Sequence, residues 1–198
     1  IQLLEVAIKL FQLISMFQNA HLLQKHYYME FSNYKKRSEI KALSIDNNMN
    51  TLTELEKKIN SELTTKIENS TINHNQLYVN INKEDLIDVS LFLKTNKDTK
   101  FRQLIDITAV DYPEEPQRFK LVYLFLSHEF NQRMILSYFI NEKEVISSLT
   151  SIFPAANWME REVFDMYGVN FKDHPDLRRI LTDYNFEGHP LRKDFPLT

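Results

Sequence analysis

The residues best suited to acid–base or metal chemistry gather near the C-terminal end of the chain. His174 and His189 stand there, close in sequence to Asp173 and Asp176. Imidazole and carboxylate groups are typical ligands of catalytic zinc, so a metal-dependent hydrolase built on this cluster is one hypothesis. However, the chain lacks a His-Glu-x-x-His helix, and arginines alternate with the carboxylates and would neutralise them. The hydrolase is therefore kept as the alternative interpretation.

The composition argues against several other classes of chemistry. The 198 residues include no cysteine, so the chain can form neither a disulfide nor a thiolate site for zinc or an iron–sulfur cluster. The two glycines, Gly168 and Gly188, are too few for a P-loop or a dinucleotide-binding loop. The net charge of −3 argues against nucleic acid or an anionic membrane as the main partner, because phosphate binding needs a concentrated basic surface.

Residue usage points to the kind of genome that encodes the chain. It holds 17 Ile, 17 Asn, 16 Lys, 14 Phe and 9 Tyr, but only 2 Gly. The abundant residues have A/T-rich codons, and no folding principle demands their excess. We therefore expect an A/T-biased genome, such as that of an organelle.

A helix is predicted over residues 155–167, with Gly168 as its end. Apolar side chains point almost all round its axis, so Glu160 falls between apolar neighbours where water is scarce. A carboxylate in such a place must be paired or protonated. We expect Glu160 to be buried and held by an arginine, and the nearest candidates in sequence are Arg178, Arg179 and Arg192.

Residues 169–198 show neither helical nor strand periodicity and contain several prolines. A structureless segment of this length inside a compact domain is uncommon unless it is functional or disordered. Its aromatic and aliphatic content contradicts disorder. Because aromatic and arginine side chains dominate the binding energy of interfaces, we predict an extended arm that binds another protein and contributes little to its own domain.

The stretch from Asn157 to Thr198 resembles the signature of the 30 kDa subunit family of respiratory complex I, the NADH:ubiquinone oxidoreductase, in its mitochondrial and bacterial branch. The family pattern is Glu-Arg-Glu, an acidic residue three positions on, two apolar residues, then a histidine and a basic residue before two apolar ones. It falls without a gap on Glu160, Arg161, Glu162, Asp165, Met166, Tyr167, His174, Arg178, Ile180 and Leu181.

The resemblance implies a non-catalytic core subunit of the peripheral, quinone-reducing arm, without a catalytic, cofactor or metal site of its own. FMN, iron–sulfur clusters, NADH and ubiquinone would belong to the assembly. The implied partners are chiefly the 49 kDa subunit and neighbouring iron–sulfur subunits, on the matrix side of the mitochondrial inner membrane, with membrane association only through the assembly. The implied signature and interface residues are Glu160, Arg161, Glu162, Asp165, His174, Pro175, Arg178, Arg179, Tyr184, Phe186, His189, Arg192 and Phe195.

The elements that must position this segment indicate an α+β domain. Alternating or β-branched and aromatic runs predict strands over residues 77–82, 104–110, 119–126 and 134–140. Helical spacing predicts helices that begin near residues 51 and 83, and a short helix over residues 142–150. We expect one mixed sheet of about four to five strands with helices packed on one face.

A separate N-terminal part precedes this domain. Residues 1–23 are predicted to form an amphipathic helix, which packs either on its own domain or on a partner, and residues 24–50 a polar tether. Glu5 and Lys9 interrupt the apolar run, which argues against a transmembrane span. The predicted parts are therefore residues 1–50, an α+β core over 51–153, and the signature helix with its arm over 154–198.

Overall fold

The computed structural model describes Lys36 and residues 51–196. The helix and tether predicted over residues 1–50 lie outside this part, apart from Lys36, which is helical. The chain divides into two compact units, Ile1–Met49 and Asn50–Thr198, and the second contains the predicted α+β core and the signature segment.

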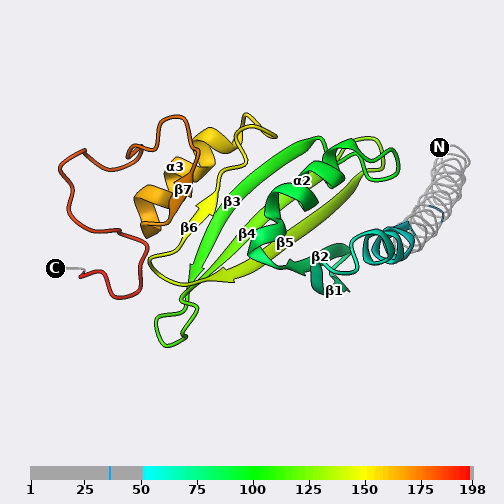
Figure 1. Cartoon of the computed structure of the whole chain (residues 1–198), viewed down its shortest axis with the longest axis horizontal. Helices are drawn as coiled ribbons and strands as arrows, with labels where there is room; N and C mark the ends of the chain where they lie inside the picture. Colours follow the sequence, from blue (N-terminus) through cyan, green and yellow to red (C-terminus); the bar gives the residue numbers. More distant parts are fainter. Residues whose placement is uncertain (1–35, 37–50, 197–198) are drawn as a thin grey trace, which may run out of the picture. The chain divides into compact units, whose positions relative to one another are not determined.

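A mixed five-stranded sheet forms the centre of this unit (Figure 1). Its strands are β1 (Ile67–Asn73), β2 (Gln76–Ile81), β3 (Gln103–Asp111), β4 (Phe119–Ser127) and β5 (Gln132–Ile140). The order across the sheet is β1-β2-β5-β4-β3, in which β2 and β5 run parallel and all other neighbours antiparallel. The four predicted strands and the α+β class are confirmed.

Helices cover one face of the sheet. Along β4 every second residue from Phe119 to Ser127 is buried, while the residues between them are only partly buried. The helical residues 51–62, the 3₁₀ turn η1 (Lys83–Asp85) with α2 (Leu86–Thr95), and α3 (Ala156–Tyr167) accompany the sheet. Apolar residues of these helices share one core with the buried side of the strands, for example Leu52, Leu93 and Val163. In Figure 1, α2 lies across the sheet, and α3 lies next to β3, the strand at one edge of the sheet.

Strand β1 was not predicted from the sequence, because it has almost no apolar pattern. It is an edge strand whose side chains are exposed or only partly buried, and it is joined to β2 by a tight turn. The turn residues His74 and Asn75 have positive φ angles of 47° and 59°. Two consecutive residues of this kind are typical of a type I′ hairpin turn, which asparagine tolerates well.

The helix predicted over residues 142–150 is wrong. This region instead contains the short strand β6 (Val145–Ser147), which pairs in parallel with β7 (Asn170–Lys172). Ile146 and Phe171 lie opposite each other in this ladder, and both are buried. The physical reason is long-range: the three residues of β6 find a partner only in a segment beyond α3, which no local pattern reveals.

Candidate functional site at the signature helix

Helix α3 ends where the tail, defined here as residues 169–196, turns back against it. Gly168 closes the helix in the left-handed conformation, with φ of 78°, and its N–H donates to the Phe164 carbonyl at 2.8 Å. A Cβ at this position would lie 2.5 Å from Nε2 of His189 and 2.6 Å from Nη2 of Arg192. Glycine is therefore needed twice, for its backbone angle and for the close approach of the tail.

Glu160 is fully buried on α3, as predicted, but it is not held by an arginine. Its Oε1 accepts the backbone N–H of Leu149 at 2.7 Å, and its Oε2 has no hydrogen-bond partner among the described residues. Burial raises the pKa of Glu160 to about 7, against the opposing effect of hydrogen bonds from Ser148 and Leu149. The expected ion pair is wrong because a backbone donor from the loop before α3 takes its place.

Two tyrosines are buried in the sheet close enough to Glu160 for its charge to affect them. The hydroxyls of Tyr123 on β4 and Tyr138 on β5 are 2.8 Å apart, and the rings stack with centroids 5.8 Å apart. Burial is the main reason that the pKa of each is raised, and the charge of Glu160 raises both further. Glu160 therefore belongs to a buried polar cluster that contains no cation.

Asp165 makes the most hydrogen bonds of the signature residues and holds the tail. Its Oδ2 accepts the backbone N–H groups of Ile180, Leu181 and Thr182 at 3.0, 2.8 and 2.9 Å. Its Oδ1 accepts from the Thr182 hydroxyl at 2.5 Å and from Nη1 of Arg179 at 2.7 Å. Burial would raise the pKa of Asp165, but the bonds from Thr182, Leu181 and Ile180 outweigh it and hold the pKa far below its usual range. Asp165 is therefore ionised and fixes residues 179–182.

Arg161 supports the same segment from a neighbouring turn of the helix. Its guanidinium donates to the backbone carbonyls of Arg178 and Arg179 at 3.0 and 3.1 Å, and it lies 5.2 Å from the Trp158 ring centroid. Arg161 and Asp165 thus satisfy backbone acceptors and donors of one irregular stretch. Glu162, between them in the signature, points outward and is exposed.

The two histidines have structural partners. Nδ1 of His174 accepts the N–H of Asp176 at 3.0 Å, so the proton lies on Nε2, which donates to the Asn157 carbonyl at 3.0 Å. His189 lies against the Asp165 carbonyl through Nδ1 at 2.9 Å. Within the part of the chain that the structure describes, no three His, Asp or Glu side chains are placed to hold a metal ion. Nothing supports the hydrolase interpretation.

Comparison with known proteins decides the family. A family model described as respiratory-chain NADH dehydrogenase, 30 Kd subunit, matches residues 79–198. The chain belongs to this family. It is therefore a subunit of a respiratory-chain NADH dehydrogenase, and the resemblance found in the sequence is confirmed.

Relatives agree with membership of the 30 Kd family, and solved structures share its fold. A NADH-quinone oxidoreductase subunit from Chelativorans sp. (strain BNC1) is 47% identical over 140 residues, which cover 71% of this chain and 70% of the relative. A subunit of the same name from Ruegeria pomeroyi is 54% identical over 123 residues, 62% of each chain. A trypsin-resistant fragment of Nqo5 has the same fold, with a TM-score of 0.52 and 24% identity over 64% of this chain and 99% of the fragment. A chain of a membrane-bound sulfane sulfur reductase, an archaeal respiratory membrane complex, has a TM-score of 0.63 and 28% identity over 73% of this chain and 85% of its own.

An arginine outside the family signature, Arg118, joins the sheet to the tail. Nε and Nη2 of Arg118 donate to Oδ1 and Oδ2 of Asp111 at 2.8 and 3.0 Å, and Nη2 also reaches Asp194 at 2.7 Å. The backbone N–H of Lys193 donates to the same Asp111 carboxylate at 2.8 Å. The sequence does not reveal this group, because Arg118 and Asp194 are 76 positions apart. One signal in the sequence could have indicated it: Asp111 is an acidic residue at a position that, by the alternation along β3, belongs to the buried face of the strand.

These contacts correct the prediction that the tail contributes little to its own domain. Val169 and Phe171 are part of the hydrophobic core, and Arg192 donates from Nε to the Tyr167 carbonyl at 2.6 Å. Leu191 donates its N–H to the Met166 carbonyl at 3.1 Å. The tail is therefore attached to the domain at its start, its middle and its end.

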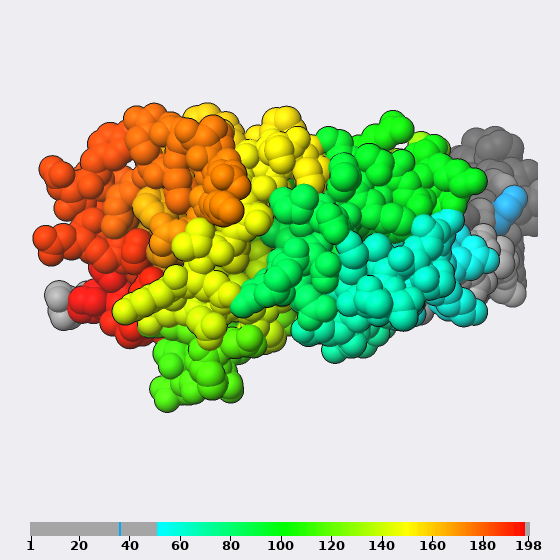
Figure 2. Space-filling view, in the orientation of Figure 1, coloured from blue at the N-terminus to red at the C-terminus, as the bar shows by residue number. Residues whose placement is uncertain are grey.

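Between these attachments the tail exposes apolar side chains. Leu181 and Tyr184 are 62% and 72% exposed, and Trp158 on the adjoining helix is 62% exposed. Phe186 and Phe195 stack on each other with ring centroids 5.9 Å apart, whereas Pro175 and Arg178 lie at the surface. In Figure 2 the tail, in orange to red, forms one end of the visible surface. Exposed aromatic and aliphatic groups on a fixed backbone are typical of a binding surface.

Proposed function

We propose that this chain is a non-catalytic scaffold in the peripheral arm of the oxidoreductase, and that its tail binds the 49 kDa subunit and neighbouring iron–sulfur subunits. The observation that carries the proposal is the exposure of Leu181, Tyr184 and Trp158 beside a backbone that Asp165 and Arg161 hold in place. The fixed carboxylate and guanidinium therefore serve to shape a surface for a partner.

Preorganisation explains why an irregular segment suits this role. An irregular loop usually loses conformational entropy when it binds, and that loss weakens the complex. In this tail the backbone N–H groups of residues 180–182 are already bound to Asp165, so less entropy remains to be lost. Most of the free energy gained when a partner buries Tyr184 and Leu181 can then contribute to affinity.

We assign the redox chemistry to the partners of this chain. FMN, the iron–sulfur clusters, NADH and ubiquinone would be bound by other subunits, because the chain has no cysteine and no glycine-rich phosphate loop. Electron transfer from NADH to quinone would depend on this chain through the positions that it gives to those subunits.

We further propose a place on the matrix side of the mitochondrial inner membrane and a gene in the organelle. The excess of residues with A/T-rich codons supports this proposal. No helix within the described residues is long and apolar enough to cross a membrane. Sequencing of purified organelle DNA tests the genomic part, and a gene found only in nuclear DNA would refute it.

The scaffold proposal is tested by weakening the tail surface without touching its supports. We expect the double variant Leu181→Ala with Tyr184→Ala to fold normally but to enter the complex poorly. Leu91→Ala is a matched control, because Leu91 on α2 is also an exposed apolar residue, at 49%, but lies outside the tail. Blue-native electrophoresis measures the yield of complex. An unchanged yield for the double variant would overturn the proposal.

A further inference from the structure

One guanidinium closes a short loop of the tail, residues 182–188, which we call the acidic loop. Nη1 of Arg179 donates to the Thr182 hydroxyl at 3.1 Å, and Nη2 donates to the Gly188 carbonyl at 2.9 Å. Inside the loop, the N–H of Phe186 donates to the Asp183 carbonyl at 2.9 Å, which is the hydrogen bond of a β-turn. The acidic loop therefore has a fixed backbone, with residues 184 and 185 at its tip.

The two aromatic residues of the acidic loop have different roles. Phe186 stacks on Phe195 with ring centroids 5.9 Å apart, and the Arg179 guanidinium lies 5.8 Å from the Phe186 centroid. Tyr184, at the tip, is 72% exposed, the highest value among the large apolar and aromatic residues that the structure describes. Tyrosine is enriched among the residues that dominate binding energy at interfaces. Phe186 thus holds the loop in place, while Tyr184 is offered to a partner.

Two carboxylates without cationic partners flank the tip. Asp183 and Glu187 are both exposed, and neither takes part in an ion pair within residues 51–196. The acidic loop itself contains no lysine or arginine. Tyr184 therefore stands between two negative charges that the described part of the chain leaves unneutralised.

The arginines of the tail are not free to neutralise these charges, because each is already paired with another carboxylate. The pairs are Arg178 with Asp176 at 2.6 Å, Arg179 with Asp165 at 2.7 Å and Arg192 with Glu142 at 2.7 Å. Of the two lysines of the tail, Lys172 is exposed next to the equally exposed Asp173, so these two charges offset each other.

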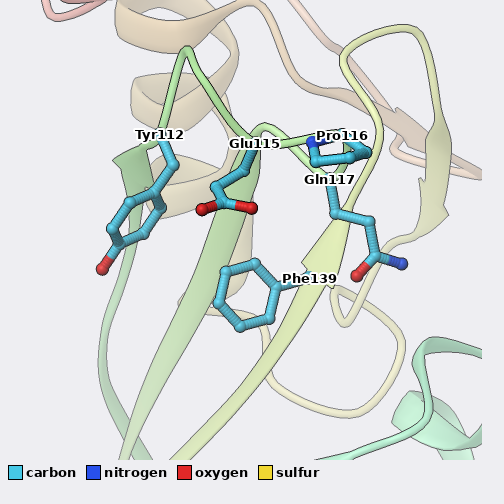
Figure 3. Close-up of a pocket in the computed structure, with 5 residues that line it drawn as sticks. All are labelled: Tyr112, Glu115, Pro116, Gln117 and Phe139. Atoms are coloured by element: carbon cyan, nitrogen blue, oxygen red, sulfur yellow. The ribbon is translucent and has the colours of Figure 1, made fainter.

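The other lysine, Lys193, lies at a hollow beside the loop between β3 and β4. Its ammonium is 5.6 Å from the centroid of the Tyr112 ring, which lines this hollow of about 590 Å³ together with Glu115 and Phe139. Figure 3 shows the Glu115 carboxylate between the Tyr112 ring and Gln117. The charge of Lys193 therefore belongs with that hollow, and the two charges of the acidic loop remain unmatched.

We propose that the acidic loop docks on a basic surface of a neighbouring subunit, where lysine or arginine side chains contact the Tyr184 ring and pair with Asp183 and Glu187. A cation over an aromatic ring and charge-assisted hydrogen bonds to carboxylates can form together at such a site. An apolar partner would bury both carboxylates without compensation. An acidic protein or an anionic lipid surface would be repelled. The inference rests on the proposed scaffold function and names the chemistry of the partner surface.

Carboxyl footprinting with a carbodiimide and glycine ethyl ester tests whether a partner covers the acidic loop. We expect Asp183 and Glu187 to be labelled roughly tenfold more slowly in the purified oxidoreductase than in the isolated full chain, because the centre of an interface excludes water. Glu114, an exposed acid between β3 and β4, is the control and should keep its rate. Equal labelling of Asp183 and Glu187 in both samples would overturn the proposal. Protection that grows with the concentration of the isolated chain would indicate a second copy of this chain, and would also overturn it.

The charge of the partner is tested by two double variants, the neutral Asp183→Asn with Glu187→Gln and the reversed Asp183→Lys with Glu187→Lys. For a basic partner, the yield of complex should fall about tenfold in the neutral variant and further in the reversed one. The same changes at Glu68 and Glu114, exposed acids outside the tail, are the matched control and should leave the yield unchanged. A neutral variant that assembles as well as the wild type, or better, would refute the basic partner.

These variants separate this inference from the scaffold proposal. The turn bond of Asp183 uses its backbone carbonyl, so changes to its side chain leave that bond in place. Amide hydrogen exchange at residues 180–182 checks that the support from Asp165 is intact in each variant. If the Leu181 and Tyr184 double variant assembles poorly but both charge variants assemble normally, the scaffold function stands and this inference is refuted.

Discussion

Glu160 and Asp165 lie on the same helix and are both fully buried, yet the pKa values of their carboxyl groups are shifted in opposite directions. Asp165 accepts from three backbone N–H groups, a hydroxyl and a guanidinium, so its charge is favoured over neutrality. Glu160 has fewer donors, the Ser148 side chain and the N–H of Leu149, and one of its oxygens has no partner among the described residues, so burial dominates. The number of donors, rather than the depth of burial, decides which carboxylate stays charged.

The raised pKa of Glu160 makes stability depend on pH. Because the pKa is raised from 4.5 to about 7, the contribution of Glu160 is fully present below pH 4.5 and is lost as the pH rises through 7. The loss should be about 3 kcal/mol of unfolding free energy. Denaturant unfolding of the wild type and of Glu160→Gln at pH 4 to 8 measures it, since glutamine keeps an acceptor for Leu149 and does not ionise. A difference between the two proteins that does not vary with pH would contradict this account.

Loss of the Asp165 charge should loosen the tail. Asp165→Ala leaves the N–H groups of residues 180–182 without their acceptor, and we expect the unfolding free energy to fall by about 3 kcal/mol. Asp183→Ala removes an exposed acid from the same segment and should change it little. Amide hydrogen exchange at residues 180–182 should accelerate only in the first variant. Equal exchange rates in both variants would show that Asp165 does not hold the tail.

At the scale of single residues the sequence predicted burial better than partnership. The azimuth of Glu160 on a helix is a local property, so its burial could be foreseen. Its hydrogen-bond partner could not be foreseen, because the N–H of Leu149 belongs to a segment predicted as helix. In addition, every residue except proline has a backbone N–H, so the residue type does not identify a backbone donor. The same holds for Asp165, whose acceptor role depends on the path of residues 180–182.

At the scale of elements, strands β2 to β5 of the main sheet were predictable because one face of each is buried, whereas the edge strand β1 has no buried face and was not. Strands β3, β4 and β5 alternate or are rich in branched and aromatic residues. Strands β6 and β7 have three residues each, too few for a period to emerge. Each of these two strands forms only because it pairs with the other. This pairing makes the beginning of the tail part of the domain.

The pairing of β6 and β7 gives a prediction opposite to the independent arm expected from the sequence. Phe171 on β7 is 5% exposed and packs in the core, so Phe171→Ala should lower the unfolding free energy by about 3–5 kcal/mol. Lys172→Ala, at the adjacent exposed position, should have almost no effect. Thermal and denaturant unfolding of both variants measure the difference. Similar stability of the two would restore the picture of an independent arm.

At the scale of the whole molecule, Arg118 links the sheet to the end of the tail. Arg118→Ala would leave the buried Asp111 carboxylate without its guanidinium, and we expect a loss of about 3–5 kcal/mol. Arg102→Ala, at an exposed arginine near the start of β3, is the control. Limited trypsin digestion should cleave after Lys193 faster in the first variant than in the second. Cleavage at the wild-type rate would show that the backbone contacts of the tail suffice without this link.

The order of the strands across the sheet differs from their order along the chain, and this has a consequence for synthesis. Strand β2 is made second, but its parallel partner β5 is made last of the five. During translation the β1–β2 hairpin must therefore wait, with one edge of β2 unpaired, until α2, β3 and β4 have emerged. Non-local parallel pairing of this kind folds slowly and leaves an open edge on which chains can aggregate. A newly made chain should thus need protection by a chaperone most between the emergence of β2 and that of β5.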